Sequence, residues 1–297
     1  MEHRIEVADN LAALAALPSG SIPLIYIDPP FNTGRTQRRT TLTVTRVDEG
    51  AGDRTGFAGN RYASTTIAHR GYADHFGDYL AFLEPRLREG YRVLSPDGSF
   101  YLHLDPRESH YVKVLMDEIF GRDGFINELI WAYDYGGRAR RRWPAKHDTI
   151  LFYVKDPKNY RFNSDEVERE PYMAPGLVTP EKVARGKLPT SVWWHTIVSP
   201  TGKEKTGYPT QKPVGVLKRI VAASSRPGDV VLDYFAGSGT TGAAALALGR
   251  RFHLIDDNPD AAAVMSERFA AVPDVEWIGA AGTSRSPSVA GAGDDGW

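Results

Sequence analysis

Residues 230–242 are VVLDYFAGSGTTG, and this stretch decides the fold. The apolar run Val230–Leu232 predicts a buried strand, and the Ala-rich segment after the glycines predicts a helix. Gly237, Gly239 and Gly242 give a Gly-x-Gly-x-x-Gly turn between them, which permits a tight bend and a close approach of a ligand to the backbone. The free N–H groups that begin such a helix suit an anionic group. The stretch therefore predicts a nucleotide-like cofactor site in an α/β protein.

Carboxylates flank this glycine loop. Asp233 ends the predicted strand and could pair with a cationic amino group, which S-adenosylmethionine has and a pyrophosphate lacks. Asp256 and Asp257 follow the next predicted strand and begin nineteen residues after Gly237. Asp256 is placed to accept hydrogen bonds from ribose hydroxyls, although both residues could instead cap the helix that follows. The loop alone would suit a nicotinamide oxidoreductase almost as well.

A second motif lies near the N-terminus, where PLIYI (23–27) predicts a strand and Asp28-Pro29-Pro30-Phe31 ends it. An exocyclic amine of a base is a poor nucleophile because its lone pair is delocalised into the ring. The Asp28 carboxylate and the Pro29 carbonyl could accept its two hydrogens, and Pro29 and Pro30 would hold that carbonyl rigidly. Phe31 offers a face on which an extruded base can stack. The alternative is a proline-rich turn with a capping Asp.

Composition excludes several chemistries. The chain has 297 residues, a net charge of −1 and no cysteine. It therefore contains no disulfide, no Cys-bound zinc and no thiolate nucleophile, and methylation of cytosine C5 through a covalent Cys adduct is ruled out. The eight histidines show no His-Glu-x-x-His spacing, and we expect no metal site. We expect a cytoplasmic protein that does not bind membranes, since no apolar run approaches about 18 residues.

Positive charge is concentrated in two segments. Residues 131–161 hold eight Lys or Arg against three Asp, and residues 35–46 hold four Arg and no acid. Such blocks suit a phosphate backbone, although a solvated loop would have the same composition. The segment 35–71 lacks clear periodicity, which predicts an irregular loop that either closes over DNA or is an insert. The predicted DNA-binding residues are Arg35, Arg38, Arg39, Arg138, Arg140, Arg141, Arg142, Trp143 and Lys146.

The remaining pattern is a regular alternation of helices and strands, which predicts a doubly wound sheet. Helices are expected at about 75–94, 107–120 and 214–225, and strands at 99–104, 125–131, 148–154 and 251–255. A last helix is expected after the strand 251–255 and ends at about residue 270. From about 131 to 205 the pattern breaks, and paired aromatic residues and clustered Arg suggest an irregular insert. The pair Trp193-Trp194 could read or wedge bases together with His195, but aromatic pairs are more often in the core, and we expect them there. His103 is expected to be structural. The Gly-, Ala- and Ser-rich residues 279–297 predict a disordered tail.

The chain resembles the β class of DNA amino-methyltransferases, which methylate adenine N6 or cytosine N4. IYIDPPFNTG (25–34) resembles their catalytic motif, DYFAGSGTTG (233–242) their cofactor motif, and YPTQKP (208–213) the segment before their first cofactor-binding helix. The order of the motifs, catalytic first and cofactor last, is that of the β class. LMDEIFG (115–121) is also similar to the family's middle segment.

The resemblance implies a Rossmann-like, seven-stranded methyltransferase sheet with one reversed strand and an inserted target-recognition region. It divides the chain into a catalytic part (1–130), a target-recognition region (131–205), a cofactor part (206–278) and the tail (279–297). It also implies S-adenosylmethionine as cofactor, double-stranded DNA as substrate with base flipping, a homodimer and a cognate restriction nuclease. An Asp at position 28 favours adenine, because cytosine-N4 members typically carry Ser there. The predicted cofactor-binding residues are Asp233, Phe235, Ala236, Gly237, Ser238, Gly239, Thr240, Thr241, Asp256, Asp257, Thr210, Lys212 and Pro213.

Three other functions stay open. An RNA or protein amine methyltransferase could use a similar proline motif, although protein-amide enzymes usually carry Asn where this chain has Asp28. A nicotinamide oxidoreductase is supported only by the glycine loop and Asp256. A catalytically silent DNA-binding module is the third alternative.

Overall fold

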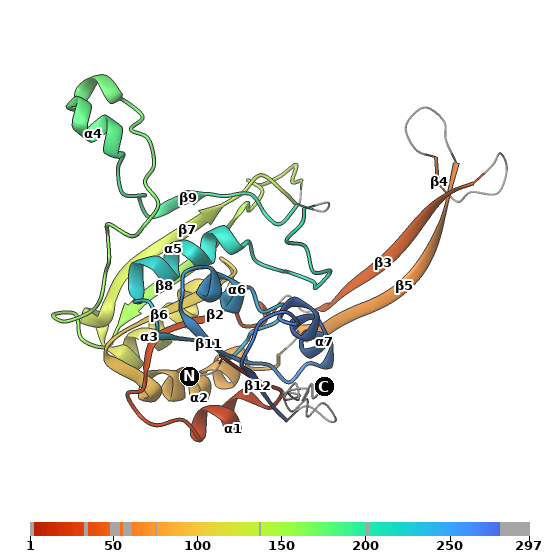
Figure 1. Cartoon of the computed structure of the whole chain (residues 1–297), viewed down its shortest axis with the longest axis horizontal. Coiled ribbons are helices and arrows are strands. Elements are labelled where there is room, and N and C mark those ends of the chain that lie inside the picture. Colours follow the sequence, from red (N-terminus) through yellow and green to blue (C-terminus); the bar gives the residue numbers. More distant parts are fainter. Residues whose placement is uncertain are drawn as a thin grey trace, which may run out of the picture.

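The computed structural model describes residues 3–32, 35–47, 54–55, 61–74, 76–136, 138–199 and 202–279. A large sheet forms the centre of the molecule (Figure 1). Its strands are β1 (His3–Glu6), β2 (Ile22–Ile27), β6 (Leu94–Leu104), β7 (Phe125–Ala132), β8 (His147–Val154), β9 (Val192–Trp194), β10 (Val230–Asp233), β11 (Arg251–Ile255) and β12 (Val275–Ile278). The main helices are α1 (Asn10–Ala15), α2 (Tyr79–Val93), α3 (Ser109–Phe120), α5 (Val214–Ser224), α6 (Thr240–Ala247) and α7 (Pro259–Arg268).

The strand order is β12-β1-β11-β10-β2-β6-β8-β7-β9. Only β8, among these nine described strands, runs against its neighbours, because it pairs antiparallel with both β6 and β7. The expected fold class with one reversed strand is confirmed. The structure adds two strands to the seven expected, the short edge strands β12 and β9. The sequence pattern had not indicated β1, β9, β12 or α1.

Helices cover both faces of the sheet, so the central strands are buried on both sides. In β2, Leu24 and Tyr26 pack into the cluster that contains α5, α6 and α7 residues. Ile25 and Ile27 point to the opposite cluster, with residues from α1, α2 and α3. This alternation explains why residues 23–27 form a nearly continuous apolar run, as a strand buried on both faces requires.

A long hairpin replaces the irregular loop expected at 35–71. Strands β3 (Arg35–Val47) and β5 (Arg61–Asp74) pair antiparallel over their whole length, and β4 (Arg54–Thr55) adds a short third strand. The hairpin projects far from the body of the molecule (Figure 1). The interpretation as a loop was wrong because it gave no weight to the β-branched residues of TTLTVT (40–45), which favour extended backbone. The side chains of Arg35, Arg38 and Arg39 lie outside the described part of the chain.

The region 131–205 is only partly irregular. Its strand β8 lies inside the main sheet, while the turn η3 (Pro175–Leu177) and the helix α4 (Pro180–Arg185) project at the side opposite the hairpin (Figure 1). Residues 280–297, expected to form a tail, lie outside the described residues. No helix in the described ranges is long and apolar enough to cross a membrane.

Candidate functional site

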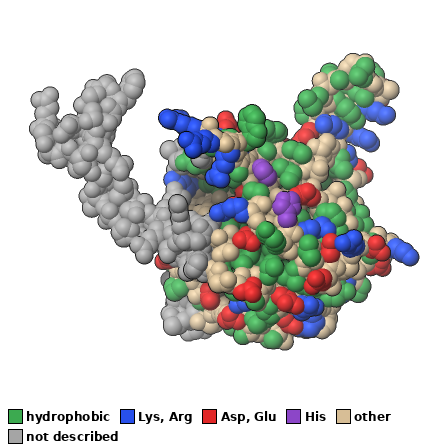
Figure 2. Space-filling view, turned by 180° about the vertical axis from the view of Figure 1, so that it is seen from behind, with side chains coloured by type: hydrophobic (Ala, Val, Ile, Leu, Met, Phe, Trp, Pro, Cys, Tyr) green, Lys and Arg blue, Asp and Glu red, His purple; other side chains and the backbone are tan. Residues whose placement is uncertain are grey.

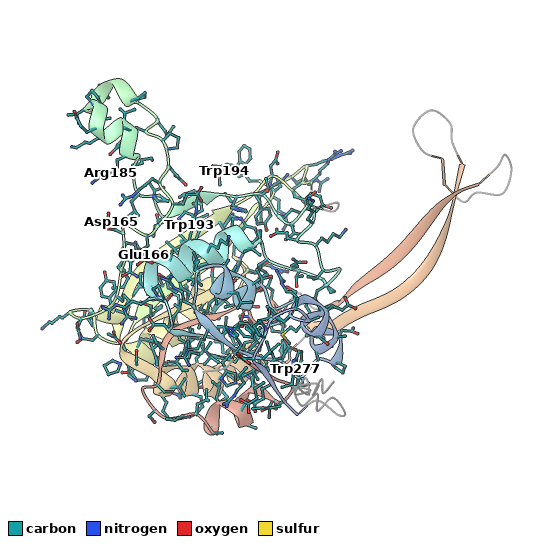
Figure 3. The ribbon with its side chains drawn as sticks, viewed as in Figure 1. Asp165, Glu166, Arg185, Trp193, Trp194 and Trp277 are labelled. Carbon is teal, nitrogen blue, oxygen red and sulfur yellow. The ribbon has the colours of Figure 1, made fainter. Side chains whose placement is uncertain are left out.

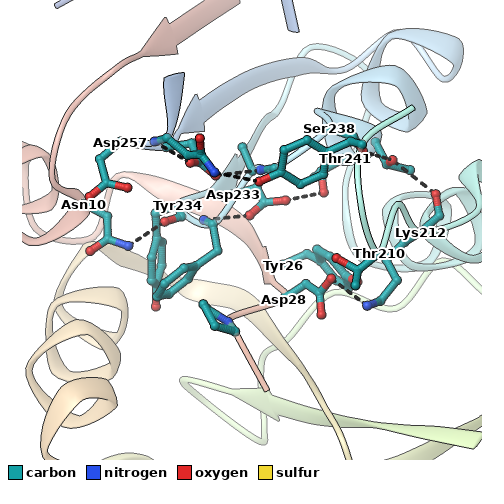
Figure 4. Close-up of a pocket in the computed structure, with 18 of the residues that line it drawn as sticks. Asn10, Tyr26, Asp28, Thr210, Lys212, Asp233, Tyr234, Ser238, Thr241 and Asp257 are labelled. Carbon is teal, nitrogen blue, oxygen red and sulfur yellow. Dashed lines mark hydrogen bonds and ion pairs between the residues drawn. The ribbon is translucent and has the colours of Figure 1, made fainter. Parts of the chain in front are cut away.

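A cavity of about 510 Å³ opens at the carboxyl ends of β2, β10 and β11 (Figure 4). This is the edge of a parallel sheet at which ligands bind, and the volume suits a nucleotide-sized molecule. The cavity joins the two motifs, which lie at opposite ends of the chain. The predicted residues that line it are Asp28, Pro30, Thr210, Lys212, Asp233, Phe235, Ala236, Gly237, Ser238, Thr240, Thr241, Asp256 and Asp257.

The glycine loop adopts a conformation that needs glycine. Gly237 and Gly239 have positive φ angles of 49° and 72°, in the left-handed region that side chains rarely enter. A Cβ on Gly242 would lie 2.8 Å from the Leu254 side chain, so the third glycine lets α6 approach β11. Gly239 is the N-cap of α6, and Pro213 is the N-cap of α5. Both residues therefore position helices at the cavity wall; Pro213, predicted as a cofactor-binding residue, begins α5 and does not itself line the cavity.

Asp233 is a buried carboxylate on the cavity wall, only 3% exposed. Its two oxygens accept hydrogen bonds from the backbone N–H of Phe235 and from the Thr241 hydroxyl. Burial, which the nearby negative charges of Asp28 and Asp256 reinforce and the two hydrogen bonds oppose, raises the pKa of Asp233 to about 7. Within the described residues no Lys, Arg or His forms an ion pair with Asp233. The site therefore fits the cationic amino group of an amino-acid moiety.

Asp256 holds the glycine loop against the end of β11. Its Oδ2 accepts a hydrogen bond from Gly237 N at 2.8 Å, and its Oδ1 accepts one from Asn258 N at 2.9 Å. Burial raises the pKa of Asp256 to about 6. The N-cap of α7 is Asn258, whose side chain accepts from Asp260 N, so the idea that Asp256 and Asp257 cap this helix was wrong. Each Asp256 oxygen keeps a lone pair that a ribose hydroxyl could use, and Asp257 is exposed at the cavity rim.

Several lining residues were missed by sequence analysis. Asp9 caps α1 by accepting from Leu11 N and Ala12 N, and Asn10 donates through Nδ2 to the Tyr234 carbonyl at 2.8 Å. Arg86 donates to Asn10 Oδ1 at 2.7 Å, and its guanidinium lies 4.0 Å from the centre of the Phe82 ring. Asp9 before an apolar segment is a helix-start signal that could have revealed α1. Nothing in the local pattern places α1 beside the glycine loop.

The catalytic motif ends β2 and faces the same cavity. Asp28 Oδ2 forms an ion pair with Lys212 Nζ at 2.8 Å, whereas Asp28 Oδ1 is buried and has no hydrogen-bond partner among the residues that the structure describes. The Lys212 ammonium also lies 4.5 Å from the centre of the Phe31 ring. Lys212 was predicted as a cofactor-binding residue. It lines the cavity, but its charged end is directed to the catalytic motif.

A buried hydrogen-bonded chain lies beside Phe31. The Tyr26 hydroxyl meets His103 Nδ1 at 2.8 Å, and His103 Nε2 lies 3.0 Å from Asp148 Oδ2. Tyr133 donates to the other Asp148 oxygen at 3.0 Å. His103 is fully buried, and its ring centre is 6.0 Å from that of Phe31. Burial raises the pKa of Tyr26 well above its ordinary value, so the hydroxyl keeps its proton. This series of hydrogen bonds, from Tyr26 through His103 to Asp148, supports the catalytic motif structurally.

Asn32 fixes the backbone immediately after the motif. It has a φ of 53°, in the left-handed region that Asn tolerates better than most residues. Its side chain donates to Glu108 Oε1 and accepts from Phe76 N, both at 3.1 Å. Asn32 therefore ties the start of the projecting hairpin to the segment that precedes α2. Sequence analysis gave it no role.

The basic segment 138–142 lies at the same edge of the sheet as Asp28. It belongs to the connection between β7 and β8, which leaves the carboxyl end of β7, and β7 runs parallel to β2. Arg138, Arg140, Arg141, Arg142 and Trp143 are exposed, while Lys146 is half-buried and pairs with Asp134. Figure 2 shows Lys and Arg side chains gathered along the upper edge of the face that it presents.

The Trp pair on β9 divides between core and surface. Trp193 is 8% exposed and packs near Arg219 of α5, whereas Trp194 is 72% exposed (Figure 3). The expectation that both lie in the core holds for Trp193 only, because neighbouring residues of a strand point to opposite faces. β9 runs parallel to β7, so Trp194 also ends at the edge of the sheet that carries the cavity.

Comparison with known proteins agrees with this geometry. Residues 22–267 match the sequence model of the N6/N4 methyltransferase family, described as DNA methylase. The chain belongs to this family of DNA methylases. It is 33% identical over 260 residues to the DNA adenine methyltransferase YhdJ of Escherichia coli (strain K12), covering 85% of this chain and 77% of that one. It is 31% identical over 275 residues to the type II methyltransferase M.HpaI of Haemophilus parainfluenzae, covering 91% and 74%.

The fold is also that of a solved structure, the complex of M1.HpyAVI with S-adenosylmethionine. The TM-score is 0.56 at 20% identity, and the match covers 90% of this chain and 98% of that one. Membership of the family makes this chain a DNA methyltransferase that acts on exocyclic amines and takes its methyl group from S-adenosylmethionine. The residues present fit that cofactor, since the cavity offers an uncompensated carboxylate, Asp233, beside a glycine loop.

Proposed function

We propose that this DNA methylase modifies adenine N6 in double-stranded DNA, by direct transfer to a base flipped into the cavity. The observation that carries the proposal is Asp28. Its carboxylate lies at the end of β2, in the same cavity as Asp233 and the glycine loop, and one of its oxygens has no partner. Two further points favour adenine over cytosine N4: an Asp at position 28 is typical of adenine enzymes in this family, and YhdJ is named an adenine methyltransferase.

The proposed chemistry assigns one task to each group. Asp28 and the Pro29 carbonyl accept hydrogen bonds from the amine, which localises its lone pair and stabilises the positive charge that develops on nitrogen. The new nitrogen–methyl bond would replace the bond between that methyl group and the sulfonium sulfur of the donor, which leaves as a neutral thioether. The methylated nitrogen then loses one proton, which the Asp28 carboxylate can receive or relay. Phe31 stacks on the base and aligns it. The cofactor supplies an electrophilic methyl group when bound. Asp233 would hold its amino group, and Asp256 its ribose, so that the base and the methyl donor meet at the edge of β2 and β10.

The proposed DNA surface is the exposed segment 138–142 together with Trp143 and Lys146, in the region 131–205 that we assign to target recognition. Its support is topological, because the loops after β7 and β9 leave the same sheet edge as the cavity. The residues 1–130 and 206–278 would then form the catalytic and cofactor parts. Arg35, Arg38 and Arg39, the homodimer, the cognate nuclease and the cytoplasmic location stay predictions.

The test is a methylation assay on DNA with base-resolved detection of the product. The protein should form N6-methyladenine at a defined site, and formation of N4-methylcytosine instead would contradict the target base. Asp28→Asn keeps the volume but removes the charge, and should lower turnover by roughly 10²–10⁴-fold. S-adenosylmethionine affinity should change little in this variant. Asp117→Asn on α3, outside the cavity, is the matched control and should keep its turnover.

A further inference from the structure

The Lys212 ammonium occupies both groups that the catalytic motif offers to a base. Its Nζ lies 2.8 Å from Asp28 Oδ2 and 4.5 Å from the centre of the Phe31 ring. The pair is shielded from solvent, since the Lys212 side chain is 9% exposed and that of Asp28 is 18% exposed. A target amine would need the same carboxylate, and its base would need the same ring face. The ammonium and the base therefore compete for one place.

We propose that Lys212 is an internal stand-in for the target amine, which it mimics in the free enzyme and which displaces it when the base enters. This inference rests on the proposed function, because it assumes that the amine binds at Asp28 and Phe31. The mimicry is chemical: an ammonium donates N–H bonds to a carboxylate and is attracted to an aromatic face, as an amine that acquires positive charge during methylation would be.

The reason for such a stand-in is the burial of Asp28. A largely buried carboxylate left without a partner is unfavourable, and removing one member of a buried pair is costly for the other. Lys212 satisfies Asp28 Oδ2 until a base replaces it. Asp28 Oδ1, which is buried and unpartnered, shows that the carboxylate has capacity for a further donor.

The surroundings of Lys212 allow its side chain to withdraw while its backbone stays fixed. Its carbonyl accepts a hydrogen bond from the Thr240 hydroxyl at 3.2 Å, at the start of α6. Thr210, two residues earlier, has a φ of 56°, which is unusual for a β-branched residue. The backbone is thus held against the cofactor half of the cavity, and the four-carbon stem supplies the movement.

Competition of this kind also selects the ligand. A group enters only if it replaces both the ion pair and the ring contact, which favours a flat base that carries an amine and disfavours one that lacks a donor. Part of the binding free energy of every base is used to displace Lys212. The apparent affinity is reduced by the fraction of molecules in which the pair is closed.

The test compares Lys212→Met and Lys212→Arg with the unchanged enzyme, on a duplex that contains the unmethylated target site. Lys113→Met is the control, because Lys113 also contacts one carboxylate and one aromatic ring, at a place away from the cavity. Its Nζ is 2.7 Å from Asp117 Oδ1 and 4.0 Å from the centre of the Phe125 ring. The measurements are the DNA KM and the dissociation constant for a duplex whose target base stands opposite an abasic position. S-adenosylmethionine affinity is measured in parallel.

Removal of the ammonium should lower the dissociation constant and the DNA KM by about 3- to 10-fold. Lys212→Arg should raise the dissociation constant and the DNA KM, because a guanidinium is a stronger partner for a carboxylate and an aromatic face. The Arg variant keeps the proposal testable if the Met variant does not fold. Lys113→Met should change neither. A higher or unchanged KM in Lys212→Met, or a loss of S-adenosylmethionine affinity in it, would overturn the inference. Failure of the proposed function is seen separately, as an unchanged enzyme that forms no methylated amine.

Discussion

Replacement of Asp233 by Asn should have opposite effects on stability and on cofactor binding. The amide has the same shape, and it keeps both hydrogen bonds: Oδ1 can accept from Phe235 N, and Nδ2 can donate to the Thr241 hydroxyl oxygen, which also accepts. What the substitution removes is a negative charge that lies inside the protein without a cation. The free enzyme should therefore become more stable, while a cationic amino group should bind more weakly.

The magnitude follows from the pKa of Asp233, which burial raises from 3.8 to about 7. The difference is about 3 units, and at 1.36 kcal/mol per unit it is about 4 kcal/mol. Because the folded pKa is raised, the carboxyl stabilises the fold most below pH 3.8, and this contribution is lost as the pH rises through about 7. The amide of the Asn variant does not ionise, so the variant does not lose this stability as the pH rises. At pH 8 it should raise the melting temperature by up to about 8 °C, since 1 kcal/mol corresponds to about 2 °C for a chain of this size.

The assay is thermal unfolding of the free enzyme at pH 5 and pH 8, with titration of S-adenosylmethionine at pH 8. The gain in melting temperature should be about 40% as large at pH 5, because Asp233 is mostly protonated in the folded protein there and only the ionisation of the unfolded chain, about 1.2 units above its pKa of 3.8, still counts. The dissociation constant should rise by about 10- to 100-fold, the contribution of a hydrogen bond to a charged group.

Asp117→Asn is the control of opposite sign. Burial opposes the charge of Asp117, but hydrogen bonds from Lys113 and Tyr153 lower its pKa, so this variant should lose stability at pH 8. Unchanged S-adenosylmethionine affinity in Asp233→Asn would refute the assignment of Asp233 to the amino group. A lower melting temperature at pH 8 would refute the charge argument.

Three further outcomes are expected. Phe31→Ala should reduce turnover less than Asp28→Asn does, since stacking contributes about 1–3 kcal/mol per base, and steady-state kinetics on DNA would contradict this if the order were reversed. Arg140→Ala with Arg141→Ala should reduce the slope of log K against log salt by up to about 2, as two lost phosphate contacts require; an unchanged slope in a fluorescence-anisotropy titration places the DNA surface elsewhere. His103→Phe should lower stability by about 1–3 kcal/mol, because Asp148 Oδ2 loses its hydrogen-bond partner while Tyr133 stays on Oδ1, and equal denaturant midpoints for both proteins would argue against the buried hydrogen-bonded series.

The local chemistry and the fold class could be predicted from the amino-acid sequence alone. Gly237, Gly239 and Asp28-Pro29-Pro30-Phe31 are read from residue type and spacing, because a left-handed turn, a fixed carbonyl and the end of a buried strand leave signatures within a few residues. The same is true of the main strands and helices. It was less true of the hairpin at 35–74, where a polar composition rich in Arg, Thr and Gly obscured the signal of the β-branched residues.

Only the tertiary structure decided which of these groups meet. Asp28 and Lys212 are far apart in the sequence. They become neighbours because α5 leads back into the amino end of β10, which is parallel to β2, so that Lys212 at the start of α5 lies at the sheet edge where Asp28 ends β2. No periodicity encodes such a contact. The same applies to Asn10 beside Tyr234, to the chain from Tyr26 through His103 to Asp148, and to the division of Trp193 and Trp194 between core and surface. Side-chain direction and pairing across the sheet are properties of the folded chain.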